Sequence, residues 1–145
     1  MDTKLKADVA ESAVVTELLK RGFRVLQPVG DRLPYDIGVD RAGKLIRIQV
    51  KSAWFNKKDA CYVVDARRTK TNRRRMLRQR YASDDFDFAV IYLADVHVFY
   101  VLPVSTFVRY GSTITIVESE KRQRRPQSAE YRERWDLLFN GSLSR

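Results

Sequence analysis

Two short segments of this chain, YDIGVD and KLIRIQVKS, alternate between apolar and polar residues, and this alternation restricts the fold more than any other feature. Successive side chains of a β-strand point to opposite faces, so the pattern predicts two strands that each bury one face. The short turn between them predicts a hairpin. Its two apolar sets, Ile37 and Val39 on one strand and Ile46, Ile48 and Val50 on the other, must share the core, which fixes the register.

The polar positions of this hairpin share the opposite face. A four-residue loop would set Asp36 directly opposite Gln49, and a two-residue loop would make them diagonal neighbours. Lys51 follows Gln49 on the same face. A three-residue loop would separate the polar residues onto opposite faces. A loop with an even number of residues therefore predicts that Asp36, Gln49 and Lys51 converge.

An amphipathic helix is predicted from Leu5 to Arg21, with Gly22 as its C-terminal stop. Glu11 lies on the mainly apolar stripe of this helix, beside Val14 and neighbouring apolar residues. A carboxylate in that position needs a partner. Position alone leaves open whether Glu11 is functional or simply a hydrogen-bonded or partly exposed helix residue.

The rest of the chain predicts further strands and a last helix. FRVLQPV, CYVVD, FDFAVIYL, VHVFYVLP and STITIV are strand-like, and the nearly all-apolar FDFAVIYL is expected at the centre of a sheet. Ser128 is a candidate N-cap for a C-terminal helix over about 128–139. The length of 145 residues suits one domain, 1–145. We expect a mixed α/β (α+β) fold in which helices flank a central mixed β-sheet.

The net charge of +10 is concentrated in two segments. Arg67 to Arg80 holds eight basic and no acidic residues, and Lys121 to Arg134 holds six basic and two acidic residues. Concentrated Lys and Arg attract a polyanion, so nucleic acid is the expected partner. The alternative is that these segments are only solvated basic loops.

Several other classes of function find no support. The longest apolar runs are shorter than the roughly 20 residues of a membrane span, and the charged N-terminus lacks the apolar core of a secretory signal. A chain with one cysteine, Cys61, and one histidine, His97, cannot build a Cys/His zinc site. The single cysteine fits a reducing cytosol. No phosphate-loop or dinucleotide motif occurs, so no nucleotide cofactor is expected.

The hairpin and the helix together resemble the PD-(D/E)xK nuclease superfamily. Pro34-Tyr35-Asp36 corresponds to the PD element with one residue inserted, and Gln49-Val50-Lys51 corresponds to the (D/E)xK element with Gln in place of the usual carboxylate. From about Ala10 to Phe107 the chain is similar to the branch of small endonucleases associated with group I introns, in which Gln is accepted at this position. The resemblance implies a restriction-endonuclease-like core.

The resemblance also implies a metal-dependent active site. Asp36 would be the principal metal ligand, together with the side-chain oxygen of Gln49 and the backbone carbonyl of Val50. Lys51 would orient the attacking water and stabilise the transition state, and Glu11 would ligate the ion or position a water. The expected ion is Mg²⁺, for which Mn²⁺ would substitute.

A DNA-contacting segment is expected over residues 65–82, where side chains that can bind phosphates or read base edges are frequent. These are Arg67, Arg68, Lys70, Asn72, Arg73, Arg74, Arg75, Arg78, Gln79 and Arg80. The resemblance to the intron-associated endonucleases implies site-specific cleavage of both strands of a long pseudo-palindromic DNA target by a homotetramer. The expected location is the bacterial cytoplasm, and the nucleoid when the protein is bound to DNA. The alternatives are a Holliday junction resolvase, a restriction enzyme, or a non-catalytic basic nucleic-acid-binding module.

Overall fold

The computed structural model describes residues 2–71, 76–118 and 125–139, and its centre is a five-stranded mixed sheet. The strands lie in the order β1-β2-β3-β8-β9. β3 and β8 run parallel, and the other neighbours pair antiparallel. The bounds of these strands are β1 Arg24–Leu26, β2 Ile37–Arg41, β3 Lys44–Ser52, β8 Phe88–Leu93 and β9 Val98–Pro103.

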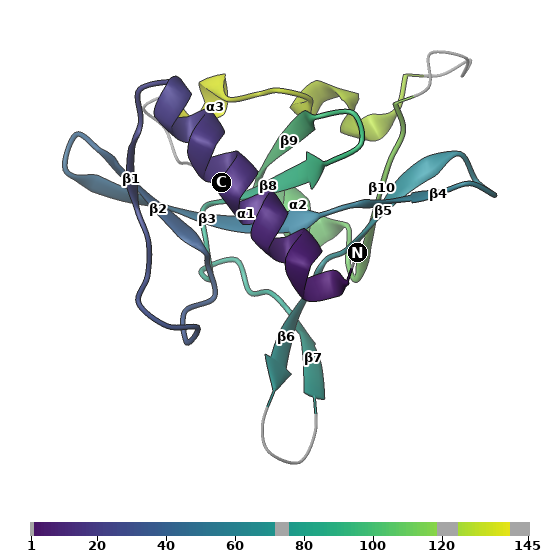
Figure 1. Cartoon of the computed structure of the whole chain (residues 1–145), viewed down its shortest axis with the longest axis horizontal. Helices are drawn as coiled ribbons and strands as arrows, with labels where there is room; N and C mark the ends of the chain where they lie inside the picture. The colour runs from purple at the N-terminus through teal and green to yellow at the C-terminus, as the bar shows by residue number, and fades with distance from the viewer. Residues whose placement is uncertain (1, 72–75, 119–124, 140–145) are drawn as a thin grey trace.

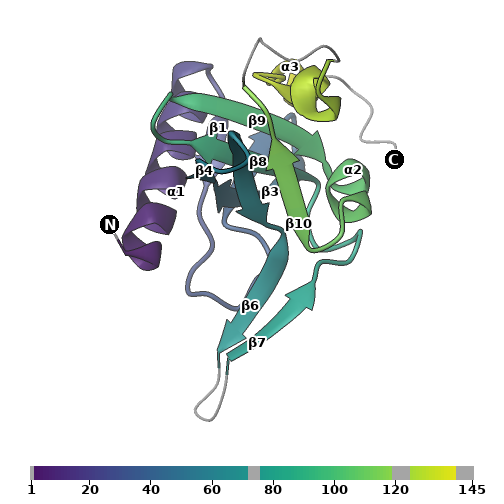
Figure 2. The same cartoon turned by 90° about the vertical axis from the view of Figure 1, so that its right-hand side faces the viewer.

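Further elements cover both faces of this sheet. Helix α1 lies on one side, while α2 and a small sheet of order β10-β5-β4 lie on the other (Figure 2). A separate hairpin, β6 and β7, extends away from the sheets in both views (Figure 1, Figure 2). The bounds are α1 Thr3–Lys20, β4 Trp54–Asn56, β5 Cys61–Asp65, β6 Arg67–Thr71, β7 Met76–Arg80, α2 Val104–Arg109 and β10 Thr113–Ile116. The predicted mixed sheet flanked by helices is confirmed.

Helix α1 follows the predicted pattern closely. The Asp2 carboxylate accepts a hydrogen bond from the backbone N–H of Leu5 at 2.8 Å and so caps the helix. Gly22, with φ +87°, follows the C-cap residue and permits the left-handed conformation that ends it. The buried positions Ala10, Val14 and Leu18 pack in one cluster with the apolar face of the β2–β3 hairpin. Burial of this stripe holds α1 against the sheet.

The β2–β3 hairpin closes with an even turn, as the convergence of its polar residues requires. Arg41 pairs with Lys44, and the turn is the two residues Ala42 and Gly43, both with positive φ. The prediction that a two-residue loop would make Asp36 and Gln49 diagonal neighbours is wrong. Pairing continues to the turn itself, so Ile37 lies opposite Ile48, which is the register of the four-residue alternative.

The second face of the sheet has its own apolar cluster, which explains the nearly all-apolar β8. Every residue of β8 is buried, because alternate side chains enter the cluster under α1 and the cluster on the other face. Ile48 and Val50 face α1, so the intervening Gln49 and the following Lys51 face away from it. No helix in the described ranges is both long and apolar enough to cross a membrane.

The C-terminal helix predicted over about 128–139 is wrong. The chain forms the 3-10 helix η1, Gln127–Tyr131, and the short helix α3, Asp136–Phe139, with an irregular segment between them. Ser128 is buried inside η1, which Pro126 precedes as the capping residue.

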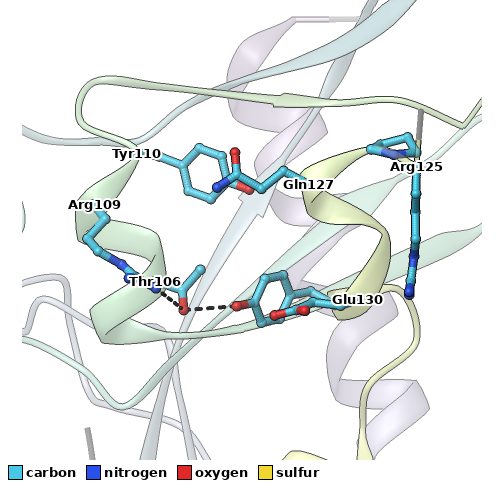
Figure 3. A pocket seen from close by; sticks show the side chains of 8 residues that line it. Thr106, Arg109, Tyr110, Arg125, Gln127 and Glu130 are labelled. Atoms are coloured by element: carbon cyan, nitrogen blue, oxygen red, sulfur yellow. Dashed lines mark hydrogen bonds between the residues drawn. The ribbon is translucent and has the colours of Figure 1, made fainter. Parts of the chain in front are cut away.

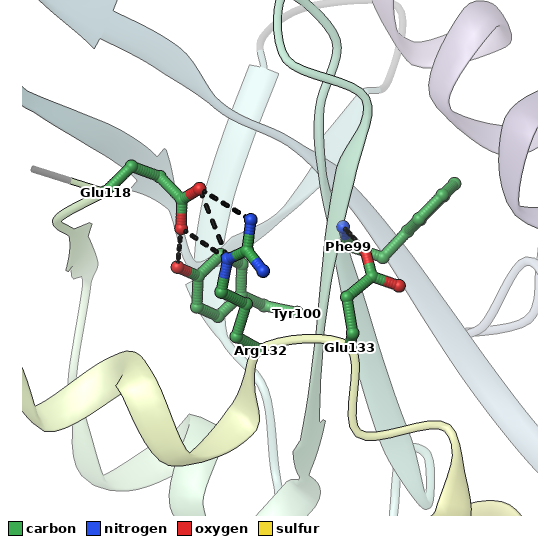
Figure 4. A network of polar contacts seen from close by, with 5 residues as sticks. All are labelled: Phe99, Tyr100, Glu118, Arg132 and Glu133. Atoms are coloured by element: carbon green, nitrogen blue, oxygen red, sulfur yellow. Dashed lines mark hydrogen bonds and ion pairs between the residues drawn. The ribbon is translucent and has the colours of Figure 1, made fainter.

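Backbone and side-chain contacts of Arg132 and Glu133 lie at this interruption (Figure 4). Arg132 is extended and forms a bridge with Tyr100, and its guanidinium pairs with Glu118 at 3.1 Å. Glu133 has φ +54°, and its carboxylate accepts hydrogen bonds from the backbone N–H of Phe99 and the indole N–H of Trp135, each at 2.9 Å. These contacts replace the backbone hydrogen bonds of a continuous helix.

Candidate functional site

Asp36 lies at the beginning of β2, one residue before the first paired position of that strand. Its backbone N–H donates to the carbonyl of Ile48, and its Oδ2 accepts from the backbone N–H of Val50, both at 2.9 Å. Burial raises the pKa of the carboxyl group, while the Val50 hydrogen bond and the charge of Lys51 act in the opposite direction. Asp36 is therefore fixed against the segment Gln49-Val50-Lys51 of β3.

Glu11 reaches the same region from helix α1. Burial raises the pKa of its carboxyl group, and the negative charges of Asp36 and then Asp8 raise it further. Glu11 is thus close enough to Asp36 for the two carboxylates to repel each other. The structure brings Glu11 and Asp36 together, and a cation between them would remove that repulsion.

Lys51 approaches from the face of β3 that points away from α1. Its Nζ donates to the backbone carbonyl of Arg67 at 2.8 Å and lies 5.0 Å from the centre of the Tyr81 ring. Burial lowers the pKa of the ammonium group to about 8, against the opposing effects of Asp36 and Asp65. Asp36 thus interacts electrostatically with both Glu11 and Lys51.

Gln49 and the Val50 carbonyl, the two predicted neutral oxygen ligands, lie beside this group. Gln49 is only 8% exposed, and its Nε2 donates to the Val50 carbonyl at 3.2 Å. The amide therefore directs its NH₂ group, and not its oxygen, at that carbonyl. In the described part of the chain no three His, Cys, Asp or Glu side chains form a metal-binding cluster. The candidate site instead combines two carboxylates with amide and backbone oxygens, which suit a hard divalent cation.

Two neighbours of Lys51, Tyr81 and Asp65, were not predicted from the sequence. Tyr81 follows the basic hairpin, and burial followed by the charge of Asp36 raises the pKa of its hydroxyl group. Asp65 ends β5 and pairs with the guanidinium of Arg67 at 3.0 Å. A lone Tyr after a basic run and an Asp at a strand end carry no spacing that distinguishes them. Only the tertiary fold brings them to Lys51.

The segment predicted to contact DNA forms the β6–β7 hairpin, directly beside the candidate site. Arg67 pairs with Arg80 at its base, next to the Lys51 contact. Three guanidinium groups there also bind the protein itself: Arg67 binds Asp65, Arg68 donates to the Arg32 carbonyl at 3.1 Å and Arg80 to the Val108 carbonyl at 3.0 Å. Gln79 is exposed.

The other predicted DNA contacts are Lys70, Asn72, Arg73, Arg74, Arg75 and Arg78. Asn72, Arg73, Arg74 and Arg75 lie outside the described residues. For Lys70 and Arg78 the structure gives the backbone, which places both within the paired strands. The DNA contacts of all these residues stay predictions.

A separate cavity of about 450 Å³ lies between α2 and η1 (Figure 3). It is polar, and Arg109, Arg125 and Glu130 are among the residues that line it. Inside it the Thr106 hydroxyl lies 3.2 Å from the Tyr131 hydroxyl. None of the site residues predicted from the sequence lines this cavity.

Two comparisons with known proteins each match the chain to an endonuclease. A family model described as PD-(D/E)XK endonuclease matches residues 1–138. Among solved structures the chain is similar to a bacterial homing endonuclease, I-Ssp6803I, with 51% sequence identity and a TM-score of 0.87 over 95% of this chain and 93% of that one. No match was found among curated protein sequences.

Proposed function

The chain belongs to the PD-(D/E)XK endonuclease family, and from this premise we propose that it is a homing-type endonuclease that cuts both strands of a specific DNA site. One observation carries the proposal: Asp36 interacts electrostatically with both Glu11 and Lys51, and Lys51 hydrogen-bonds the first residue of the basic β6–β7 hairpin. A hydrolytic centre beside a DNA-binding element is what such an enzyme requires. The similar structure is that of a homing endonuclease, which favours this specificity over that of a junction resolvase or a restriction enzyme.

Nucleases of this family generally use divalent metal ions, and we propose Mg²⁺, with Mn²⁺ as a substitute. The residues fit such an ion, because two partly buried, mutually repelling carboxylates form a hard-oxygen site that a cation would stabilise. Asp36, the Gln49 oxygen and the Val50 carbonyl would hold it, with Glu11 as a direct or indirect ligand. Once bound, the ion would supply positive charge at the phosphate and lower the pKa of a nearby water.

The protein's own residues would do the rest of the chemistry. The Lys51 ammonium has three N–H donors, one of which is used by the Arg67 carbonyl. The others are available to orient the attacking water and to stabilise the negative charge that develops on the phosphate. Lys51 is partly buried, and charge stabilisation there is worth more than it is in water.

Gln49 gives this site an unusual charge balance. With Glu11, Asp36 and Lys51 charged, the site carries −1, whereas a glutamate at position 49 would make it −2. A neutral amide oxygen is a weaker ligand for a hard dication, so ion binding should depend more strongly on the substrate phosphate. The amide would also have to present its oxygen in place of the NH₂ that now bonds Val50.

The β6–β7 hairpin is proposed to hold the DNA. Its arginines would neutralise phosphates, and some of its Arg, Asn and Gln side chains would read base edges in the major groove. Two cuts in a pseudo-palindromic target require two related active sites, so we propose a homo-oligomer, and by the resemblance a homotetramer encoded with a group I intron. We propose that it acts in the bacterial cytoplasm, on the nucleoid.

The test separates cleavage from binding. A plasmid library with randomised inserts and four-way junctions are incubated with the protein and Mg²⁺, and the cut ends are sequenced. We expect linear products from one rare site, and junction cutting would instead indicate a resolvase. Asp36→Ala and Lys51→Ala should abolish cleavage of the selected site and change its dissociation constant by less than about fivefold. Either variant cutting at the wild-type rate would refute the assigned site.

A further inference from the structure

The Lys51 ammonium is held at two points that belong to one structural element. The first is the carbonyl of Arg67, the first residue of β6, at 2.8 Å. The second is the ring of Tyr81, whose centre lies 5.0 Å from Nζ and which directly follows Arg80, the last residue of β7. Because Arg67 and Arg80 pair with each other, both contacts come from the base of the β6–β7 hairpin.

The Tyr81 ring is itself fixed by the apolar cluster on that face of the sheet. It packs edge-on against Phe86 at 5.2 Å and Phe107 at 5.9 Å between ring centres. Phe86 and Phe107 are almost fully buried, at 0% and 1% exposure, so they offer the ring little freedom. A cation over the face of a fixed aromatic ring is attracted by the ring quadrupole, which restricts where the flexible lysine chain can place its charge.

We propose that Tyr81 is a positioning residue for Lys51 and that, with the Arg67 carbonyl, it places the ammonium group beside Asp36. This inference rests on the proposed function of Lys51. Lysine has a flexible four-carbon stem and three rotatable donors, so it does not hold one position unaided. The ring face and the carbonyl restrict the ammonium on two sides, and Asp36 is close enough for its negative charge to act on the pKa of the ammonium group.

The hairpin thereby gains a second role. The element proposed to seat the DNA also carries both contacts that hold Lys51. DNA that fixes the base of the hairpin would fix the ammonium group as well, so correct binding would favour correct placement of the lysine.

The experiment compares Tyr81→Leu, which removes the ring, with Tyr81→Phe, which keeps it. Single-turnover cleavage is measured at saturating protein on the duplex recovered from the plasmid library, and binding of the same duplex is measured separately. Misplacement of a catalytic group by about 1 Å can cost about a hundredfold, so we expect Tyr81→Leu to lower the rate about 10- to 100-fold. The DNA affinity of Tyr81→Leu should stay within about threefold of wild type. The cleavage rate and the DNA affinity of Tyr81→Phe should also stay within about threefold of wild type.

Two controls make the result independent of folding. Phe99→Leu removes a buried ring from the cluster on the other face of the sheet, which does not contact Tyr81, so it should lower thermal stability but change the cleavage rate of the folded protein by less than about threefold. In NMR spectra of the DNA-free protein, the Lys51 ε-methylene protons should be shifted upfield by the Tyr81 ring. That shift should persist in Tyr81→Phe and disappear in Tyr81→Leu.

Three outcomes would overturn the inference. These are wild-type cleavage by Tyr81→Leu, an equal loss in Tyr81→Leu and Phe99→Leu, and a loss in Tyr81→Phe as large as that in Tyr81→Leu, which would assign the effect to the hydroxyl group. The failure of the proposed function looks different: Lys51→Ala would then cut as well as wild type. If Lys51→Ala is inactive and Tyr81→Leu is fully active, the positioning role of Tyr81 is refuted and the proposed function of Lys51 is not.

Discussion

Replacing Lys51 by methionine should stabilise the protein at neutral pH while it removes nuclease activity. Methionine has a similar length and no charge, so it can occupy the same space between the Arg67 carbonyl and the Tyr81 ring. The wild-type lysine must keep its charge in a largely desolvated position. Charged side chains that are kept in desolvated positions despite the cost in stability are typical of functional sites.

The magnitude follows from the pKa of Lys51, which burial lowers from 10.5 to about 8. At about 1.36 kcal/mol per pKa unit, the folded state disfavours the charged form by about 3 kcal/mol. The variant loses the hydrogen bond to the Arg67 carbonyl, so we expect a net gain of about 1 to 2 kcal/mol in the free energy of unfolding.

The pH dependence gives the sign of the effect. Below pH 8 the folded and the unfolded wild-type chains both hold the proton, so the cost of burying the charge is fully present. Between about pH 8 and 10.5 the unfolded chain still holds the proton that the folded chain has released, and wild-type stability rises relative to the variant. The advantage of Lys51→Met should therefore shrink over this interval.

Urea denaturation at pH 7, 8, 9 and 10 measures this difference. Lys58→Met alters an exposed lysine in the turn between β4 and β5 and serves as the control, with an expected change below about 0.5 kcal/mol. The reasoning is refuted if Lys51→Met is less stable than wild type at pH 7, or if the difference between them does not change up to pH 10.

Two further predictions concern the ligand set and the C-terminal segment. Gln49→Glu should still cleave DNA and should bind Mn²⁺ about tenfold more tightly, measured by calorimetry, because it adds a carboxylate to the site. Loss of cleavage with intact folding and DNA binding would contradict the ligand role of Gln49. Glu133→Ala should lower the free energy of unfolding by about 2 to 4 kcal/mol, because the Phe99 amide and the Trp135 indole lose their acceptor. Asp136→Ala breaks only an exposed ion pair with Arg134 and should cost less than about 1 kcal/mol, so equal losses in the two variants would count against this account.

The spacing of apolar residues was sufficient to predict the secondary structure of segments that bury one face or both faces. Helix α1, the long strand β3 and the buried strand β8 follow directly from their apolar patterns. The even parity of the β2–β3 turn was enough to bring Asp36 and Lys51 together, because a shared core leaves the register little freedom.

Periodicity failed where tertiary contacts decide the backbone. The spacing of Tyr131, Trp135 and Leu138 suits a helix, but Glu133 hydrogen-bonds β9 and Arg132 bridges it, which ends η1 early. The polar β6–β7 hairpin has no apolar alternation to indicate its strands. Tyr81 could not have been identified because its partner Lys51 is 30 positions earlier in the sequence and only the fold joins them.

We propose above all that Asp36, which directly precedes β2 and interacts electrostatically with Glu11 and Lys51, is the metal ligand of a nuclease centre. Anomalous diffraction from a crystal of the protein with Mn²⁺ and the uncleaved duplex of the selected site tests it most directly. The account predicts an anomalous peak in contact with the Asp36 carboxylate, the Val50 carbonyl and a phosphate of the DNA. A fully occupied Mn²⁺ elsewhere on the protein, with Asp36 contacting neither metal nor DNA, would contradict it.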